Sequence, residues 1–212
     1  PHNSELWLCN HYYGLAKMDD KGIKPIDISG TMTNQYVTSI AFDDNEQWLL
    51  GGMYYLYRFK DGKLSDAYPF YNLLSPFAYV SDIQICDNMR TYVSWYNAWN
   101  KDIGFFILTN DGLEPVRSTN DNTTCGSTNK MALDEHNNVW LATANDGLVK
   151  YDGKFFTYFD MENSDIPTNS IADVKIDDGG NVWGVGGNFL FQYDGHVFHK
   201  IIYDSNYTND YL

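Results

Sequence analysis

The sequence predicts an all-β fold, a β-propeller of five four-stranded blades in which the C-terminal strand closes the N-terminal blade. Three observations predict this fold. Aromatic residues make up 17% of the 212 residues, and aromatic and β-branched side chains favour strands. A unit of strand, Asp/Asn/Gly turn and Trp-containing strand recurs along the chain. The segment 208–212 is similar to the start of a unit at 168–172, whereas the first unit lacks its first strand.

One large aromatic residue marks each repeat. The marker residues are Trp7, Trp48, Tyr92, Trp140 and Trp183, which are spaced 41 to 48 residues apart. Four-stranded propeller blades of the WD type have a period of about 40–45 residues. A Trp in each unit is expected to fill the space between adjacent sheets. We therefore expect the four tryptophans in the core and not in a binding site.

The repeat boundaries predict a single domain over residues 1–212. Its blades are expected at 1–30 together with 205–212, 31–72, 73–120, 121–164 and 165–204. Asp-Gly dipeptides are expected to form hairpin turns, because Gly adopts positive φ without a steric cost. Closure of the first blade by the last segment would leave no long strand edge bare. The alternative is a fragment of a longer array of blades.

Two units show the clearest form of the repeat. Residues 177–183 read Asp-Asp-Gly-Gly-Asn-Val-Trp, and residues 191–195 read Phe-Gln-Tyr-Asp-Gly; the unit from 139 to 153 has the same pattern. This unit resembles the two-component regulator propeller repeat. In that family the repeats build periplasmic sensor domains of bacterial hybrid histidine kinases, many of which respond to carbohydrate. The resemblance implies a periplasmic or extracellular propeller that binds a ligand or a partner.

Composition and charge exclude several functions. Acidic residues outnumber basic ones, which leaves a formal net charge of −14. Such a surface disfavours binding to nucleic acid or anionic lipid. No apolar run approaches the ~18 residues that a membrane helix needs, so direct membrane insertion is not expected. Two Asn-X-Thr sequons, at 122–124 and 206–208, fit a secreted chain. We expect a monomer.

Neither a cofactor nor a metal is predicted. The three cysteines, Cys9, Cys86 and Cys125, show no C-x-x-C spacing, so they indicate neither a zinc site nor a redox pair. Residues 177–181 are expected to form a turn, because they lack the alternating oxygen ligands and the distal Glu of an EF-hand calcium loop. The five histidines are scattered over turns and termini.

The predicted binding site lies in the loops that follow the second strand of each blade. Loops held by a rigid scaffold commonly bind ligands, and three of these five loops are aromatic. Aromatic rings beside amides and carboxylates suit a sugar, because rings cover C–H bonds while polar groups bind hydroxyls. The predicted stacking residues are Tyr12, Tyr13, Tyr54, Tyr96 and Trp99, and the predicted hydroxyl partners are Asn97, Asn145, Asp146 and Asn188. The same side chains could form a hot spot for a protein partner.

No catalytic residue is predicted, and the chain is expected not to be an enzyme. A further alternative is a glycoside hydrolase, which needs two carboxylates at a defined separation. Alignment of the first strands places Ser39, Asp82, Lys130 and Asp173 at one equivalent position. Asp82 and Asp173 would then be the acid pair. The opposing interpretation is a polar ring of structural ion pairs.

Overall fold

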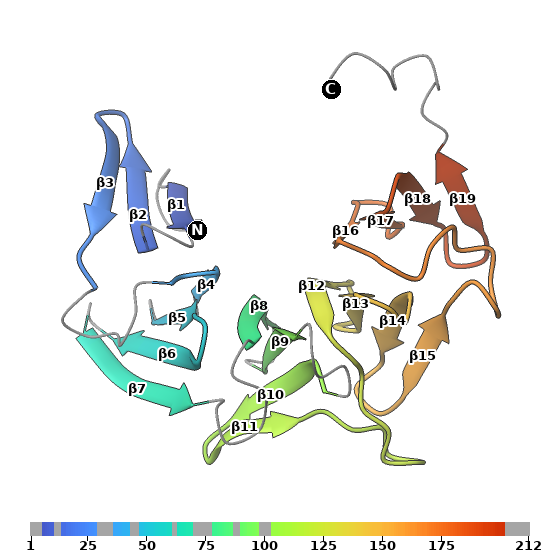
Figure 1. The fold of residues 1–212 in the computed structure, drawn as a ribbon, viewed down its shortest axis with the longest axis horizontal. Coiled ribbons are helices and arrows are strands. Elements are labelled where there is room, and N and C mark those ends of the chain that lie inside the picture. Colours follow the sequence, from blue (N-terminus) through green and yellow to red (C-terminus); the bar gives the residue numbers. More distant parts are fainter. Residues whose placement is uncertain are drawn as a thin grey trace. The chain divides into compact units, whose positions relative to one another are not determined.

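A computed structural model of the chain describes residues 6–10, 14–28, 36–42, 47–60, 63–69, 78–86, 90–97 and 103–201 (Figure 1). The chain divides into two compact units, residues 1–129 and 130–212. All helices and strands assigned to the described residues are β-strands and none is a helix, which confirms the all-β prediction. Within the same described ranges, no helix is long and apolar enough to cross a membrane.

Unit 1 contains three antiparallel sheets. The first has the order β1 (Leu6–Asn10), β2 (Gly14–Asp19), β3 (Gly22–Ile26). The second has the order β4 (Ser39–Phe42), β5 (Trp48–Gly51), β6 (Tyr55–Lys60), β7 (Lys63–Pro69). The third runs β8 (Ala78–Ile85), β9 (Thr91–Asn97), β10 (Phe105–Thr109), β11 (Gly112–Pro115).

Unit 2 holds two further four-stranded sheets, the first of which begins just before the boundary between the units. Its strands are β12 (Thr128–Leu133), β13 (Val139–Thr143), β14 (Leu148–Tyr151) and β15 (Phe156–Phe159). The last sheet is β16 (Asp173–Ile176), β17 (Val182–Gly186), β18 (Phe189–Tyr193) and β19 (Phe198–Ile201). Neighbouring strands in each sheet are consecutive in the chain, as predicted from the repeats. The predicted closing segment, 205–212, lies outside the described residues.

Among the described residues, the Asp-Gly dipeptides at 111–112, 152–153 and 194–195 form the predicted hairpin turns. Asp152 Oδ1 accepts hydrogen bonds from the backbone N–H groups of Lys154 and Phe155, at 2.9 and 2.8 Å. Gly153 takes a φ of 94°, which is favourable only for Gly. The pair at 194–195 repeats this geometry at the turn between β18 and β19.

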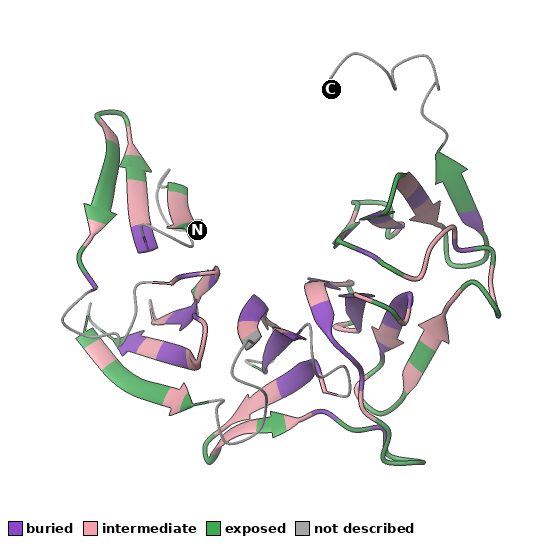
Figure 2. Cartoon of the chain, in the orientation of Figure 1, coloured by how far each residue is buried: buried purple, intermediate pink, exposed green. Residues whose placement is uncertain are grey.

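The core of each unit lies between adjacent sheets, and Figure 2 shows buried residues concentrated in the central strands. In unit 1, one cluster joins β1–β3 to β4–β7 and consists of Leu15, Ile28, Val37, Leu50, Tyr57 and Phe59. A second cluster joins β4–β7 to β8–β11 and consists of Leu49, Leu56, Val80, Ile83, Val93, Trp95 and Phe106. In unit 2, the cluster between the two sheets includes Trp140, Leu148, Val182 and Phe191.

Trp48 does not occupy the position that the repeat alignment predicted. Trp48 packs in the cluster toward β1–β3, with its ring centroid 4.8 Å from that of Trp7. Leu49 packs toward the next sheet instead, as Trp7 and Trp140 do from their own strands. Successive side chains of a strand point to opposite faces, so Leu49 holds the marker position in this repeat. The expectation that this tryptophan packs in the interior is nevertheless correct.

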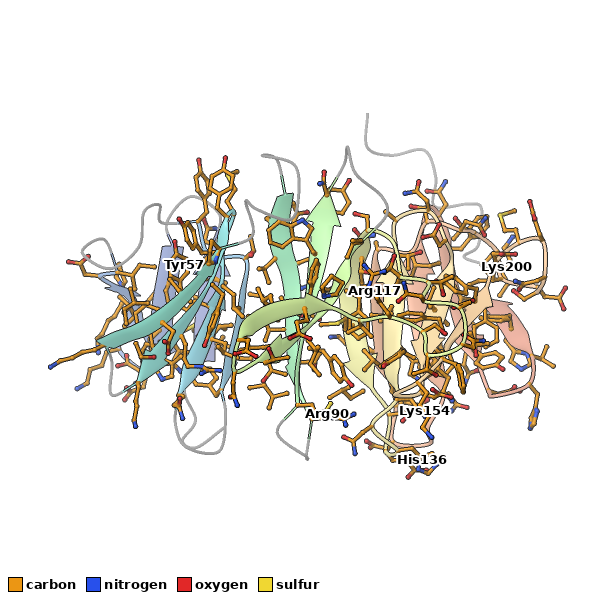
Figure 3. The ribbon with its side chains drawn as sticks, turned by 90° about the horizontal axis from the view of Figure 1, so that it is seen from below. Tyr57, Arg90, Arg117, His136, Lys154 and Lys200 are labelled. Atoms are coloured by element: carbon orange, nitrogen blue, oxygen red, sulfur yellow. The ribbon has the colours of Figure 1, made fainter. Side chains whose placement is uncertain are left out.

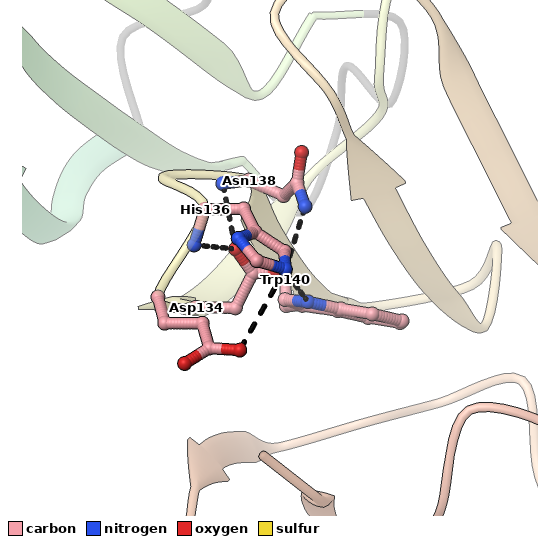
Figure 4. A network of polar contacts seen from close by, with 5 residues as sticks. Asp134, His136, Asn138 and Trp140 are labelled. Carbon is pink, nitrogen blue, oxygen red and sulfur yellow. Dashed lines mark hydrogen bonds and ion pairs between the residues drawn. The ribbon is translucent and has the colours of Figure 1, made fainter.

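A carboxylate fastens the marker tryptophan in unit 2 to the preceding turn (Figure 4). Asp134 accepts hydrogen bonds from the backbone N–H groups of His136 and Asn138, at 3.0 and 2.9 Å. It also accepts from Asn138 Nδ2 at 2.8 Å and from Trp140 Nε1 at 3.1 Å. Burial raises the pKa of Asp134, but these hydrogen bonds outweigh burial and leave the pKa below its usual value.

The same arrangement, which we call the Asp–Asn–Trp clip, recurs at residues 177–183. Asp177 accepts from the N–H groups of Gly179 and Asn181, both at 2.9 Å, and from Trp183 Nε1 at 2.8 Å. The Trp183 indole, followed by the Asn181 side chain and backbone, lowers the pKa of Asp177 to about 2. N–H groups of the protein itself therefore donate hydrogen bonds to this carboxylate, and residues 177–181 are part of a turn as predicted.

Candidate functional site

The candidate site lies where the β5–β6 turn meets the first strand of the next sheet in unit 1. The N–H of Gly52 donates to the carbonyl of Tyr55 at 3.0 Å, which closes the turn. The N–H of Val80 donates to the carbonyl of Gly52 at 3.1 Å, which ties the turn to β8. Because β8 begins and β9 ends at this point, Tyr79 and Tyr96 lie at the same end.

Tyrosines gather at this end, which we call the tyrosine end and define by Tyr54, Tyr55, Tyr57, Tyr79 and Tyr96. The rings of Tyr55 and Tyr57 form a tilted pair with centroids 5.4 Å apart. Tyr79 and Tyr96 are cross-strand partners, with centroids 5.3 Å apart and planes inclined by 35°. Tyr57 is buried, whereas the other four tyrosines are half-buried and keep part of their surface in water. Four partly exposed tyrosines therefore lie beside a hydrogen-bonded turn.

The two sheets approach each other closely at this end. A Cβ atom on Gly51 would lie 2.4 Å from Cγ1 of Val80, so a larger residue would push the sheets apart. The carbonyl of Gly51 accepts hydrogen bonds from both the N–H and the hydroxyl of Thr38, at 2.9 and 3.0 Å. The glycines therefore serve packing, and the tyrosines are held by the packed strands.

Burial raises the pKa of the Tyr79 phenol, and the neighbouring Tyr96 raises it further. Tyr79 therefore stays protonated through the physiological range, where its hydroxyl can both donate and accept a hydrogen bond. An uncharged phenol of this kind can bind a ligand hydroxyl in either direction.

Asn97 lies elsewhere than the sequence led us to expect. We expected it in an exposed loop, but it is the last residue of β9 and is only 1% exposed. Its N–H donates to Ser127 Oγ at 2.8 Å, and its carbonyl accepts from the Ser127 hydroxyl at 3.2 Å. These bonds extend β9 past the expected strand end, so the Asn97 side chain is not presented to a ligand in this conformation. Trp95, in the same strand, is 1% exposed and belongs to the core.

The remaining predicted residues fall into two groups. Tyr12, Tyr13 and Trp99 lie outside the described residues. Asn145, Asp146 and Asn188 lie in unit 2, in the turns that follow the second strands β13 and β17. Asn145 and Asn188 are exposed, and Asp146 is half-buried.

The β13–β14 turn is preorganised by hydrogen bonds. The N–H of Asp146 donates to Thr143 Oγ1 at 2.8 Å, and the Thr143 hydroxyl donates to the carbonyl of Gly147 at 2.7 Å. In Figure 3, His136 and Lys154 mark the other end of this sheet, where the β12–β13 and β14–β15 turns lie. Antiparallel order thus separates the predicted binding turns from the Asp-Gly turns, as the sequence led us to expect.

Sequence reasoning did not identify Tyr55, Tyr57 and Tyr79 as parts of the site. Residues 54–57 read Tyr-Tyr-Leu-Tyr, and this local density of aromatic residues was a usable signal. Tyr79 could be found only from the strand register, because it stands opposite Tyr96 in the β8–β9 hairpin.

The carboxylates of the enzyme alternative lie in different units. Asp82 is 8% exposed and accepts from Ser39 Oγ at 3.4 Å and from Gln84 Nε2 at 3.3 Å. Asp173 is half-buried, and its Oδ1 accepts from the N–H of Val174 at 2.8 Å. Two neutral side chains of its own unit thus donate hydrogen bonds to Asp82.

No protein-family model matches the chain, and no curated protein matches it either. Solved structures do match. The chain is similar to the extracellular domain of a hybrid two-component system from B. thetaiotaomicron, with 19% identity and a TM-score of 0.64, over 82% of this chain and 22% of that one. A second such domain from B. thetaiotaomicron gives 19% identity and a TM-score of 0.66, over 86% of this chain and 25% of that one.

An enzyme also matches. A catalytically inactive variant of virginiamycin B lyase from Staphylococcus aureus, solved with quinupristin, shares 14% identity with a TM-score of 0.70, over 94% of this chain and 66% of that one. The chain spans less than a quarter of the first extracellular domain's length, at 22%. These matches support the resemblance to sensor propellers at the level of the fold. Together with the five antiparallel sheets, they show that the chain has a β-propeller fold.

Proposed function

We propose that this chain is an extracytoplasmic, ligand-binding propeller of the sensor type that recognises a carbohydrate at the tyrosine end. The observation that carries the proposal is the Tyr79–Tyr96 pair, two half-buried rings 5.3 Å apart beside the β5–β6 turn. Ring faces cover the C–H surfaces of a sugar, while phenol hydroxyls bind its hydroxyl groups. Because packed strands hold the rings, little ordering entropy is lost on binding.

The extracytoplasmic location rests on two supports. The repeat resembles that of periplasmic sensors, and two of the matching solved structures are extracellular domains of hybrid two-component systems. The Asn-X-Thr sequons are compatible with this location. A direct check is fractionation of the source cells, with the protein expected in the envelope or the medium.

We further propose that the chain binds its ligand without converting it chemically. The fold likeness to virginiamycin B lyase makes this point worth testing. The test is to incubate the bound glycan with the chain and to separate the products by chromatography. Unchanged glycan is expected, and cleavage that Asp82→Asn or Asp173→Asn abolishes would favour the glycoside hydrolase alternative.

The experiment for the binding function is a glycan-array screen of the parent chain and matched variants. Tyr54→Ala and Tyr96→Ala alter the tyrosine end, and Trp99→Ala tests the predicted stacking residue in the next loop. Phe155→Ala is the control, because Phe155 is an exposed aromatic residue, 39% exposed, in an Asp-Gly turn of unit 2. Thermal melts establish that each variant is folded.

The expected result is binding by the parent and by Phe155→Ala, with at least tenfold weaker binding by Tyr96→Ala. If the folded parent bound no glycan on the array, that result would contradict carbohydrate recognition. The protein-partner alternative would then be tested at the same tyrosines, since Tyr is also typical of interface hot spots.

A further inference from the structure

We infer that Ser127 is a positioning residue of the tyrosine end, whose hydroxyl holds the Tyr79–Tyr96 pair in the orientation that binds carbohydrate. This inference rests on the proposed function, because it concerns the same site. Ser127 is the last residue of the β11–β12 connection. Its role follows from how this connection is bonded to the two strands that carry the rings.

Ser127 holds the end of β9, the strand that carries Tyr96. Its Oγ accepts a hydrogen bond from the N–H of Asn97 at 2.8 Å, and its hydroxyl donates to the carbonyl of the same residue at 3.2 Å. Asn97 directly follows Tyr96 and ends β9. One side chain therefore bonds both main-chain groups of the residue next to Tyr96, which restricts the backbone from which the ring projects.

The neighbouring residue holds β8, the strand that carries Tyr79. The hydroxyl of Ser81, the bulged residue of β8, donates to the carbonyl of Thr128. Ser94 Oγ, on β9, lies 2.8 Å from Ser81 Oγ. Because the Ser81 hydroxyl proton is already used, the Ser94 hydroxyl is the donor in this second bond. Residues 127 and 128 are thus bonded to both strands of the β8–β9 hairpin.

The segment 125–128 is itself held against the start of β10. The N–H of Gly104 donates to the carbonyl of Cys125 at 2.8 Å, and the Thr128 hydroxyl donates to the carbonyl of Gly126 at 2.9 Å. A Cβ atom on Gly104 would lie 2.0 Å from the carbonyl oxygen of Gly126, so the two backbones are in direct contact. The serine hydroxyl on this segment is therefore placed by main-chain bonds and close packing.

These polar groups lie in the interior of unit 1. The buried members of the network are Ser81, Ser94, Asn97, Ser127 and Thr128. A buried polar group costs free energy unless it is hydrogen-bonded, and a bonded network permits fewer arrangements than apolar packing does. The network therefore favours one arrangement of the hairpin end, and with it one arrangement of the two rings, whose centroids lie 5.3 Å apart.

The first measurement needs no ligand. With isotopically labelled tyrosine, nuclear Overhauser contacts between the Tyr79 and Tyr96 rings are recorded in the parent, in Ser127→Ala and in Thr109→Val. The last variant is the matched control, because the Thr109 hydroxyl also makes two main-chain hydrogen bonds, at 3.2 and 3.0 Å, but in the turn at the other end of the same sheet. The ring contacts are expected in the parent and the control, and they are expected to weaken severalfold in Ser127→Ala.

The second measurement is binding by titration calorimetry. The probes are cellohexaose, mannohexaose and the glycan that the parent binds most tightly on the array. Ser127→Ala is expected to bind about fivefold more weakly than the parent, through lost hydrogen bonds, whereas Thr109→Val should match the parent. In a Tyr96→Ala background, Ser127→Ala should cause no further loss, because a group that acts through this ring has nothing left to position. A general loss of stability would weaken binding in both backgrounds.

Thermal melts establish that each variant is folded, and Ser81→Ala carries the same test if Ser127→Ala does not fold. Unchanged ring contacts in a folded serine variant would overturn this inference and leave carbohydrate recognition in place. An equal loss of affinity with and without the Tyr96 ring would do the same. If the folded parent binds no probe and no glycan on the array, the proposed function fails, and the ring contacts decide separately whether Ser127 holds the pair.

Discussion

The indole nitrogen of Trp183 lies 2.8 Å from Oδ2 of Asp177, and Trp140 stands in the same relationship to Asp134 one repeat earlier, at 3.1 Å. In both cases the carboxylate also accepts from the backbone of the turn, so one side chain shapes the turn and orients the marker ring. In unit 2 the clip links a polar turn to Trp140, which packs in the core cluster between the two sheets, and to Trp183, which is half-buried in the last sheet.

The clip at Asp177 predicts a specific loss of stability in acid. The pKa of this carboxyl is about 2 in the folded chain, against a usual value of 3.8. The unfolded chain therefore binds the proton more readily, so the stabilisation is complete above about pH 4 and is lost as pH falls toward 2. Asp177→Asn should melt at a lower temperature than the parent at pH 7, and this difference should shrink between pH 4 and 2.

The measurement is thermal unfolding of both proteins from pH 2 to 7. Asp178→Asn is the control, because it removes an exposed carboxylate from the same turn without touching the clip. A constant difference between Asp177→Asn and the parent across this range would contradict the assignment of the pKa shift to folding.

Gly186 should not tolerate a side chain. A Cβ atom at this position would lie 2.0 Å from the backbone carbonyl oxygen of Ser170, which cannot move without shifting the strand connection. Gly186→Ala should destabilise the chain by about 1–3 kcal/mol, the usual cost of overpacking. Denaturant unfolding measures this change, with Val185→Ala as control because Val185 is 41% exposed. Equal stability of the two variants would show that the strands separate easily here.

His199 should control the ionisation of Asp194. Its Nε2 lies 2.9 Å from Asp194 Oδ2, and this contact, ahead of the backbone N–H groups of Val197 and His196, lowers the pKa of Asp194. His199→Ala should therefore raise the pKa of Asp194 toward the usual carboxyl value. Carbon-13 NMR titration of the carboxyl group measures it, with His136→Ala as the control. An unchanged titration would mean that the turn amides alone hold the carboxylate.

The predicted closing strand can be tested by truncation. Removal of residues 205–212 should lower the melting temperature and speed amide hydrogen exchange in β1, because an edge strand without a partner exposes its backbone groups. The measurement is residue-resolved hydrogen exchange of the full chain and the truncated chain, with β14 as an internal reference. Unchanged exchange in β1 would argue that the segment does not complete the N-terminal blade.

Strand content and turns were predictable from the sequence because they depend on local chemistry. Gly153 follows Asp152 in a hairpin that needs a positive φ, and this requirement is visible in the dipeptide itself. The sequence did not indicate which face of β5 carries Trp48, because Trp48 and Leu49 are both apolar and both faces of β5 are buried. A shift of one residue in the alignment of a strand moves every side chain to the opposite face of the sheet.

The candidate site was predictable only in part, for a related reason. The aromatic turn at Tyr54 could be read directly, but the extent of β9 could not. The β8–β9 pairing shifts register between Val80 and Asp82, which leaves Ser81 as a bulge. Neither this irregularity nor the resulting burial of Asn97 has a signal in the local sequence, since both depend on hydrogen bonds with distant strands.

The edge-to-face contact of Trp7 and Trp48, with ring planes inclined by 65°, provides an intrinsic optical reporter. Two indoles at this distance couple their electronic transitions, which produces a paired signal in the circular dichroism of the aromatic bands. The signal depends on β1 being docked against β5. Separation of the first two sheets could therefore be followed in the unlabelled protein, distinct from unfolding elsewhere. Trp7→Phe would remove the signal of the indole pair while keeping an aromatic ring at this position.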